Sequence, residues 1–332
     1  MASPSIGIIG AGGTISSLAS DPRDYLDYPE TGRKLSVEEV LERLPELDAF
    51  ADLVPIGFRS VGSSAIGPSD WLRLHQAITT AVRHNPAIAG FVILHGTATL
   101  EETAYFLSLT LPATLPVVVV GAQRPLNTVS SDAAANAINA VRVAADPASY
   151  GRGVMVVMND EIHAARDATK GSTYRLHAFH SAANGPIGFA DPDRVVFRFP
   201  AHPPTSEEPA FDVDGMTELP RVDIAYSYAG CDGAAVEAFR AAGAAGIVSA
   251  AFAPGIPAPL ERQALCEAAR AGTVIVQSSR VGQGRVARRG WLDAQGWVAA
   301  GDLSPVKARI LLSLALRQTT DIGRIQDFFD RY

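Results

Sequence analysis

Apolar residues along the chain form two kinds of run. Short continuous runs are typical of strands buried on both faces of a parallel sheet, and the first half of the chain has four: Ile6–Ile9, Ile88–Leu94, Pro116–Gly121 and Gly153–Met158. Between them, apolar residues recur at every third or fourth position, which predicts amphipathic helices over Ser36–Leu44, Asp70–Arg83, Leu100–Leu109 and Ala133–Ala144. Strands that alternate with helices predict an α/β fold whose parallel-type sheet is flanked by helices on both faces.

This pattern is interrupted between Phe197 and Pro220, where proline, serine and glutamate dominate and indicate an inter-domain linker. A shorter alternation then resumes. It predicts strands over Val222–Tyr228, Gly246–Ala250 and Val274–Gln277, and helices over Ala234–Ala242, Leu260–Ala271, Pro305–Gln318 and near Ile325–Phe329. We therefore predict a larger N-terminal α/β domain (1–196), a linker (197–220) and a smaller C-terminal α/β domain (221–332).

The composition limits the classes of protein to which the chain can belong. Its 332 residues are 47% hydrophobic and only 19% charged, so the core is large, and partner subunits are expected to cover part of the surface. The net charge of −7 argues against nucleic acid as a partner. The apolar runs are far shorter than the ~20 residues of a membrane helix, and no signal peptide is visible, so we expect a cytoplasmic protein. Cys231 and Cys266 give neither a disulfide framework nor zinc spacing.

The first candidate site lies where the first predicted strand ends, at Gly10-Ala-Gly-Gly-Thr14. The dinucleotide fingerprint G-x-G-x-x-G would need its third glycine at Ile15, so that interpretation fails at its most discriminating position. What remains is a glycine turn that exposes the Thr14 hydroxyl at the carboxyl edge of the sheet, where ligands bind in open α/β folds. Taken alone, the segment fits an ordinary turn threonine better than a catalytic one.

The second candidate site follows the strand Ile88–Leu94 and reads His95-Gly-Thr-Ala-Thr99. Gly96 permits a tight turn, and Thr99 with Glu102 predicts a capping box that opens the next helix. Thr97 would then lie near a helix N-terminus, where N–H groups attract a carboxylate or a developing oxyanion. A capping box is common, so Thr97 could also be simply part of the cap.

The third candidate site runs from Val157 to Lys170, where polar residues crowd the end of a buried strand. Desolvation lowers the pKa of a lysine, so a neutral Lys170 beside a hydroxyl could act as a base. For any single residue here, a solvated loop with Arg166 and Asp167 in ion pairs is the better interpretation. His163 is expected to be a structural hydrogen-bonding residue, because no second metal ligand stands four residues further on.

Together these segments resemble the bacterial-type asparaginase/glutaminase family over nearly the whole chain. Gly12-Gly13-Thr14-Ile15 is similar to the first family signature, and His95-Gly96-Thr97 followed by Glu101-Glu102-Thr103-Ala104 is similar to the second. Further family blocks are similar to Gly121-Ala122 with Arg124-Pro125, to Met158–Lys170 and to the tail Lys307–Leu316. Several blocks in family order are a specific signal, whereas each block alone is not.

The resemblance implies hydrolysis of a side-chain amide through an acyl-threonine intermediate, without metal or cofactor, in a homotetramer built from intimate dimers. Thr14 would be the nucleophile, with Tyr28 or Tyr25 as its partner from a flexible loop. Thr97 and Lys170 would form a second hydroxyl–amine pair. The substrate-binding residues would be Ser63, which binds the substrate carboxylate, and Ser64, Gly96 and Ala98.

The sequence departs from the family pattern in three places. The second signature reads His-Gly-Thr-Asp-Thr in the family, where the aspartate binds the α-ammonium group of asparagine, but Ala98 stands here. The Gly-Asn-Gly-Asn stretch is replaced near Phe252-Ala-Pro-Gly255. After Ser278-Ser279-Arg280-Val281, where an acidic residue is often supplied to the partner's site, this chain has Arg285, Arg288 and Arg289. We therefore expect a substrate without a free α-ammonium group, such as a lactam, an N-acylated asparagine or an aryl-bearing amide.

Two alternatives stay open. The chain could be a genuine L-asparaginase in which other contacts compensate for Ala98, or a non-catalytic homologue that binds a small molecule. The second alternative is disfavoured because Thr14, Thr97 and Lys170 are all retained, whereas only the expected specificity residues differ.

Overall fold

The computed structural model describes residues 3–199 and 208–332, and the chain divides into two compact units, Met1–Gly215 and Met216–Tyr332. Residues 200–207 of the predicted linker therefore lie outside the described residues. The part that follows packs with the first unit, because Phe211 and Val213 are buried. The Phe211 N–H also donates to the Leu109 carbonyl at 3.0 Å. The boundary between the units thus falls inside the segment predicted as a linker.

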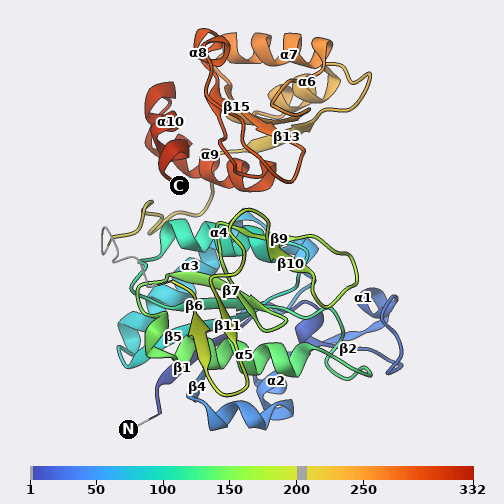
Figure 1. The fold of residues 1–332 in the computed structure, drawn as a ribbon, viewed down its shortest axis with the longest axis vertical. Helices are drawn as coiled ribbons and strands as arrows, with labels where there is room; N and C mark the ends of the chain where they lie inside the picture. Colours follow the sequence, from blue (N-terminus) through green and yellow to red (C-terminus); the bar gives the residue numbers. More distant parts are fainter. Residues whose placement is uncertain (1–2, 200–207) are drawn as a thin grey trace. The chain divides into compact units, whose positions relative to one another are not determined.

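The first unit is built on an eight-stranded sheet with the order β12-β11-β8-β7-β6-β5-β1-β4 (Figure 1). The central strands β4, β1, β5, β6 and β7 are parallel, as the continuous apolar runs predict, while β8, β11 and β12 extend the sheet with antiparallel pairs. The strands span Ser5–Gly10 (β1), Asp52–Ile56 (β4), Ile88–Leu94 (β5), Val117–Val120 (β6), Val154–Met158 (β7), Glu161–Ala164 (β8), Gly188–Ala190 (β11) and Val195–Phe197 (β12).

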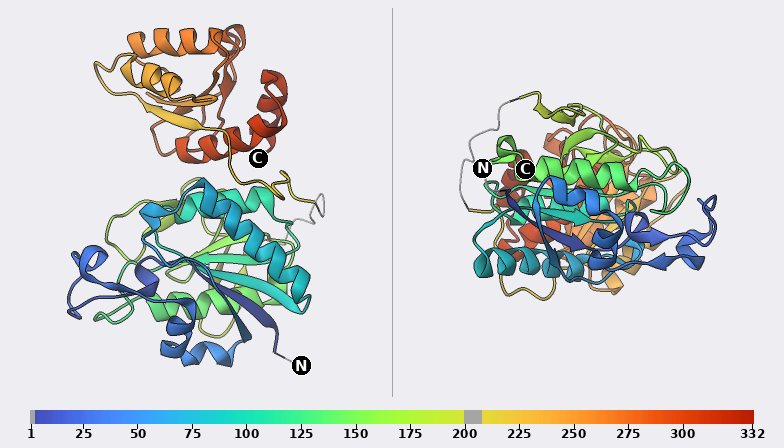
Figure 2. Two further views of the ribbon diagram at one scale, coloured as in Figure 1. Left: turned by 180° about the vertical axis from the view of Figure 1, so that it is seen from behind. Right: turned by 90° about the horizontal axis from the view of Figure 1, so that it is seen from below.

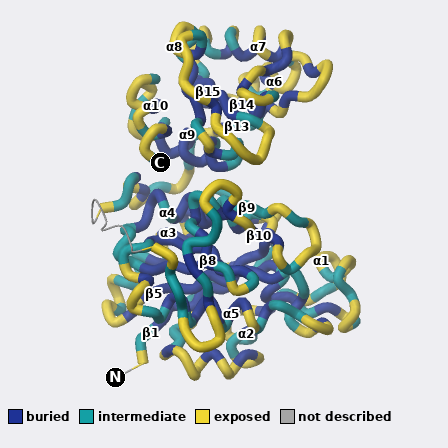
Figure 3. Tube along the Cα trace, in the orientation of Figure 1, coloured by how far each residue is buried: buried dark blue, intermediate teal, exposed yellow. Residues whose placement is uncertain are grey.

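Helices cover both faces of this sheet (Figures 1 and 2). On one face lie α2 (Val37–Arg43) and α5 (Ala133–Ala145), and on the other lie α3 (Pro68–His84) and α4 (Leu100–Thr110). The core beneath α2 and α5 takes alternate residues of the strands, among them Ile6, Ile8, Val92, Leu94, Val118 and Val120. Figure 3 shows the strands as the most deeply buried part of the unit. The mixed α/β fold with helices on both faces is thereby confirmed.

Short elements join the larger ones. After β1 come η1 (Thr14–Ser16), β2 (Ser17–Leu18), α1 (Tyr28–Thr31) and β3 (Arg33–Lys34), and β2 pairs with β3 so that the loop carrying α1 is closed at its base. The remaining short elements are η2 (Pro45–Ala49), η3 (Ser63–Ala65), η4 (Pro147–Ser149), β9 (Ala168–Lys170) and β10 (Phe179–Ser181), of which β9 and β10 form a hairpin.

The second unit has a four-stranded parallel sheet with the order β13-β14-β15-β16. Helices α6 and α7 pack against each other, and α9 packs against β13, β14 and β15. The strands span Val222–Tyr226 (β13), Gly246–Ala251 (β14), Val274–Ser279 (β15) and Val298–Ala299 (β16). The helices span Ala234–Ala241 (α6), Pro259–Arg270 (α7), Gly290–Gln295 (α8), Pro305–Gln318 (α9) and Ile322–Arg331 (α10). The smaller C-terminal α/β domain is therefore confirmed.

Candidate active site

The first two candidate segments meet at the carboxyl edge of the large sheet. Strands β1 and β5 are neighbours, and β4, which comes between them in the sequence, pairs with the opposite side of β1. The chain thus changes direction along the sheet between β1 and β5, and in open α/β sheets ligands bind at such a switch point. Thr14 follows β1 and Thr97 follows β5, so both candidate threonines lie at this point.

Thr14 is paired with Tyr28. Gly12 and Gly13 adopt φ values of 92° and 80°, which glycine reaches without strain, and Thr14 then begins η1. The Thr14 and Tyr28 hydroxyl groups share a hydrogen bond of 2.7 Å. Burial, and to a smaller degree the Asp132 carboxylate, raises the pKa of Tyr28 although the Thr14 contact opposes this, so the phenol is not ionised at neutral pH.

Tyr25, the other tyrosine considered for this role, faces a different partner. Its hydroxyl donates to the Val129 carbonyl at 2.7 Å, and the Arg124 guanidinium lies 5.2 Å from its ring centroid. Of the two tyrosines on the loop, it is Tyr28 that lies against Thr14.

Thr97 is paired with Lys170. The Lys170 ammonium donates to Thr97 Oγ1 at 2.6 Å, and the Lys170 main-chain N–H donates to Glu101 Oε1 at 3.1 Å. Burial lowers the pKa of Lys170, while the Glu101 carboxylate opposes this shift. The lysine predicted to stand beside a hydroxyl thus does so, across 73 residues of sequence.

A residue that the sequence analysis missed also contacts Thr97. The Thr97 hydroxyl donates to Gln123 Oε1 at 3.0 Å, and Gln123 follows β6, the strand next to β5. Its position three residues after a buried parallel strand is a signal for a site residue, but the contact with Thr97 depends on the register of β5 and β6.

Ser63 joins a third segment to the same edge. It is buried in η3, and Ser63 Oγ accepts the Ala98 N–H at 3.2 Å. The Thr99 hydroxyl donates to the Ser63 carbonyl at 2.8 Å, so the capping box predicted at Thr99 is wrong: α4 has no side-chain cap there. Ser64 and Ala98 are exposed.

A buried chain of hydrogen bonds holds the turn between β5 and Thr97. Trp71 Nε1 donates to Thr103 Oγ1 at 3.1 Å, and Thr103 Oγ1 lies 2.9 Å from His95 Nε2. Because Trp71 can only donate, the Thr103 proton is free for His95 Nε2, and the Nδ1 proton then goes to the Gly96 carbonyl at 2.8 Å. Burial lowers the pKa of His95 to about 4, so the ring is neutral at pH 7.

Other polar residues singled out in the sequence have partners of their own. His163 is buried, with Nδ1 3.0 Å from Ser181 Oγ, as expected for a structural histidine. Arg166 and Asp167 form an ion pair at 3.6 Å. In the second unit, Arg289 donates to the Gly255 carbonyl at 3.0 Å, so two of the places that depart from the family pattern are in contact.

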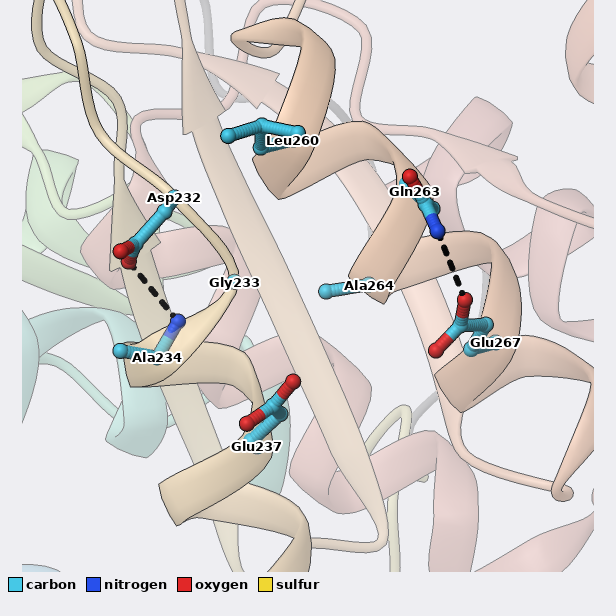
Figure 4. Close-up of a pocket in the computed structure, with 8 residues that line it drawn as sticks. All are labelled: Asp232, Gly233, Ala234, Glu237, Leu260, Gln263, Ala264 and Glu267. Carbon is cyan, nitrogen blue, oxygen red and sulfur yellow. Dashed lines mark hydrogen bonds between the residues drawn. The ribbon is translucent and has the colours of Figure 1, made fainter.

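A cleft between α6 and α7 does not have the chemistry of the candidate site (Figure 4). Its polar side chains are Asp232, Glu237, Gln263 and Glu267, and none of its eight lining residues carries a hydroxyl group or a basic side chain. Within residues 3–199 and 208–332, no group of three His, Cys, Asp or Glu side chains is arranged to hold a metal ion. In the same ranges, no helix has the length and apolar character needed to cross a membrane.

Comparisons with known proteins agree over both units. Residues 5–202 match the family model described as "Asparaginase, N-terminal", and residues 221–329 match "Glutaminase/Asparaginase C-terminal domain". L-asparaginase 2 of Escherichia coli (strain K12) is 41% identical and aligns with 100% of this chain and 94% of its own length. The glutaminase-asparaginase of Pseudomonas fluorescens biotype A is 35% identical, over 98% of this chain and 90% of its own length. The crystal structure of a probable cytoplasmic L-asparaginase from Campylobacter jejuni superimposes with a TM-score of 0.92 at 36% identity, covering 98% and 99% of the two chains.

Proposed function

Since the chain belongs to the asparaginase/glutaminase family of amidohydrolases, we propose that it cleaves a carboxamide or lactam C–N bond with the Thr14 hydroxyl as the nucleophile. The observation that carries this proposal is the 2.7 Å hydrogen bond between Thr14 and Tyr28 at the switch point of the sheet. A threonine hydroxyl attacks a carbonyl only when a neighbouring group takes its proton. Tyr28 is the group in hydrogen-bond contact with it.

The proposed reaction has two halves. In the first, Thr14 Oγ1 attacks the amide carbon and gives its proton to Tyr28, while Tyr28 passes its own hydroxyl proton on to the leaving nitrogen, because an un-ionised phenol cannot hold both. The tetrahedral intermediate then loses the protonated nitrogen, as ammonia from a carboxamide or as a tethered amine from a lactam, and leaves an acyl-threonine ester. In the second half, water hydrolyses this ester and restores the Thr14 hydroxyl.

Thr97 and Lys170 are proposed to serve these proton transfers from the neighbouring strand. Lys170 Nζ already donates a hydrogen bond to Thr97 Oγ1, and because burial lowers the pKa of its ammonium group, Lys170 can give up this proton more readily. Thr97 also lies just before α4, and the partial positive charge at the N-terminus of that helix stabilises a developing negative charge.

The proposed substrate lacks a free α-ammonium group, because Ala98 offers no charge to pair with one. Removing the carboxylate partner of a buried ammonium costs on the order of 3–5 kcal/mol, which corresponds to at least a roughly hundredfold loss of affinity. A carboxylate on the substrate still has a partner in Ser63. Since Ser63 Oγ accepts the Ala98 N–H, its own proton is left for a carboxylate oxygen.

The same family membership supports a homotetramer built from intimate dimers, and the resemblance to the Campylobacter jejuni protein, described as probable cytoplasmic, supports a cytoplasmic location. Light scattering on the purified protein tests the assembly. A mass four times that of one chain is expected, and a monomer would contradict it.

The function is tested on a panel of L-asparagine, L-glutamine, Nα-acetyl-L-asparagine and a lactam, with ammonia release and mass spectrometry of the products. We expect turnover of the acylated or cyclic substrates, loss of turnover in Thr14→Ala, and little change in Thr31→Ala, whose exposed hydroxyl donates to the loop carbonyl of Asp27. If the enzyme hydrolysed L-asparagine with the kcat/KM of an ordinary enzyme, the chain would be a genuine asparaginase, and the proposed preference for substrates without an α-ammonium group would be refuted. Binding without hydrolysis, or equal rates in Thr14→Ala, would refute the nucleophile.

A further inference from the structure

Gln123 links the two segments that carry the Thr97–Lys170 pair. Its side-chain oxygen accepts the Thr97 hydroxyl proton at 3.0 Å. Its side-chain nitrogen donates to the carbonyls of Thr173 and Arg175 at 3.3 and 3.1 Å, in the segment directly after Lys170. Its main chain is fixed as well, because the Gln123 N–H donates to both carboxylate oxygens of Asp132 at 3.1 and 2.9 Å.

The chemistry of these partners fixes the orientation of the Gln123 amide. Main-chain carbonyls can only accept hydrogen bonds, so the group that faces Thr173 and Arg175 must be the NH₂ group. The carbonyl oxygen of the amide therefore faces Thr97, where it can only accept. The assignment of oxygen and nitrogen, which is ambiguous for an isolated glutamine, follows here from the contacts.

This orientation determines where the single hydroxyl proton of Thr97 points. Because Gln123 Oε1 takes that proton, Thr97 Oγ1 can only accept from Lys170, and the hydrogen bonds run from Lys170 through Thr97 to Gln123. A neutral Lys170 could accept the Thr97 proton only if the hydroxyl turned away from Gln123. We propose that Gln123 is a positioning residue that holds the Thr97 proton away from Lys170 and so keeps Lys170 as the donor of the pair.

The proposal rests on the proposed function for its meaning in catalysis, but the hydrogen-bond direction does not depend on turnover. The charged and titratable groups in this part of the site are Glu101 on α4, which accepts the Lys170 N–H, His180 on β10, which lies against Gly171, and Asp132, which accepts the Gln123 N–H. None of these groups is altered when the Gln123 side chain alone is changed. A change in the pKa of Lys170 therefore reports on the loss of the Gln123 side-chain amide.

Two substitutions at Gln123 should move the pKa of Lys170 in opposite directions. Gln123→Met has a similar length but no acceptor, so the Thr97 proton can turn to Lys170 and the Lys170 pKa should fall by about 0.5–1. Gln123→Glu places a carboxylate beside the Thr97 hydroxyl. Its negative charge strengthens the hydrogen bonds that run from the Lys170 ammonium through Thr97, so the Lys170 pKa should rise by about one. If Gln123 merely anchored the loop, both variants would loosen it, and hydration would raise the Lys170 pKa in both.

The titration can be followed without any substrate. The chain has three lysines, Lys34, Lys170 and Lys307, so protein labelled with ¹³C at the lysine ε-carbon gives three signals, and Lys170→Arg identifies the one of interest. Lys34 and Lys307 serve as internal references, and Gln76→Met, on the exposed side of α3, is the matched control. Opposite shifts in the two Gln123 variants with an unchanged control support the proposal. Shifts in the same direction, or no shift, overturn it.

Activity measurements separate this inference from the proposed function. On a hydrolysed substrate, the basic limb of the kcat profile should move to lower pH in Gln123→Met and to higher pH in Gln123→Glu. If the wild-type enzyme hydrolysed none of the substrates but the Lys170 pKa still moved in opposite directions in the two variants, the proposed function would be refuted and the role of Gln123 would stand. If the enzyme were active but the Lys170 pKa did not change in the variants, the proposed function would stand and the role of Gln123 would be refuted.

Discussion

Gly13 and Gly96 lie against each other with no room for a side chain between them. A Cβ added at Gly13 would lie 2.0 Å from the Gly96 Cα, and one added at Gly96 would lie 2.8 Å from the Gly13 Cα. The two glycines follow the neighbouring parallel strands β1 and β5, and each is followed directly by a candidate threonine. This main-chain contact therefore brings Thr14 and Thr97 to the same part of the sheet edge.

Gly13→Ala should destabilise the protein because two effects add. With φ 80° and ψ −169°, Gly13 lies in a backbone region that is essentially restricted to glycine, at a cost of about 1–3 kcal/mol for other residues, and the clash with the Gly96 backbone cannot be relieved by a side-chain movement. We expect the free energy of unfolding to fall by about 2–4 kcal/mol, measured as a lower urea midpoint. Gly57→Ala is the control, since a Cβ there meets nothing within 4 Å. Equal midpoints for the two variants would show that the contact is not tight.

Tyr28→Phe should lower kcat far more than Tyr25→Phe. Both changes remove one hydroxyl from the same loop, but only the Tyr28 hydroxyl contacts Thr14, while that of Tyr25 contacts the Val129 carbonyl. A group that takes a proton in the transition state contributes roughly 10²–10⁴-fold, so a loss of that size is expected for Tyr28→Phe and only a small change for Tyr25→Phe. Steady-state kinetics on the best substrate decide this, and similar losses in both variants would indicate that the loop acts only by its shape.

The long elements could be predicted from the sequence because each has its own apolar period. The strand Ile88–Leu94 and the helix Pro305–Gln318 have the predicted limits. Helix α2 follows the predicted segment Ser36–Leu44 closely, and Ser36 and Glu39 form a capping box at its N-terminus. The strands β8, β11 and β12 could not be predicted in this way, since runs of three or four residues show no period. The last helix, expected only near Ile325–Phe329, spans Ile322–Arg331 because Asp321 caps it.

Candidate site residues could be predicted from the sequence where their position at the end of a strand was a sufficient signal. Thr14, Thr97 and Lys170 each follow or end a strand, and the family resemblance added Tyr28 and Ser63. The contacts of Gln123 and Thr99 were not predictable, because they join residues 26 and 36 positions apart, and such pairs are set by sheet register and not by local pattern. The Thr99 hydroxyl donates to the Ser63 carbonyl and does not cap α4, and a rule based on local sequence cannot predict a partner 36 residues away.

Acid should destabilise the protein in part through His95. Burial holds its pKa at about 4 in the folded state, against 6.5 in the unfolded chain. The unfolded state therefore binds the proton more readily, so the stability from the neutral ring is complete above about pH 6.5 and is lost as the pH falls toward 4. Between these values His95 should contribute a slope of about 1.4 kcal/mol per pH unit.

Urea unfolding of the wild type and His95→Gln between pH 6.5 and 4.5 tests this. The variant is expected to be less stable at pH 7, since the contact to the Gly96 carbonyl is altered, but its stability should fall less steeply with acid. The difference in slope is the measured quantity, so a general loss of stability does not mimic it. Parallel curves would mean that the His95 ring is not kept neutral by burial.

Ala98→Asp should restore recognition of an α-ammonium group. Ala98 is exposed two residues before α4 begins, and its N–H donates to Ser63 Oγ, so the new carboxylate would stand beside the proposed carboxylate site. A charge partner for a desolvated ammonium is worth on the order of 3–5 kcal/mol, so kcat/KM for L-asparagine should rise by at least about a hundredfold relative to Nα-acetyl-L-asparagine. Ala98→Asn, of the same size without the charge, should leave that ratio near the wild-type value. If both variants raised it equally, or neither did, the preference would depend on shape or on a neighbouring subunit, and the missing carboxylate at position 98 would not explain the specificity.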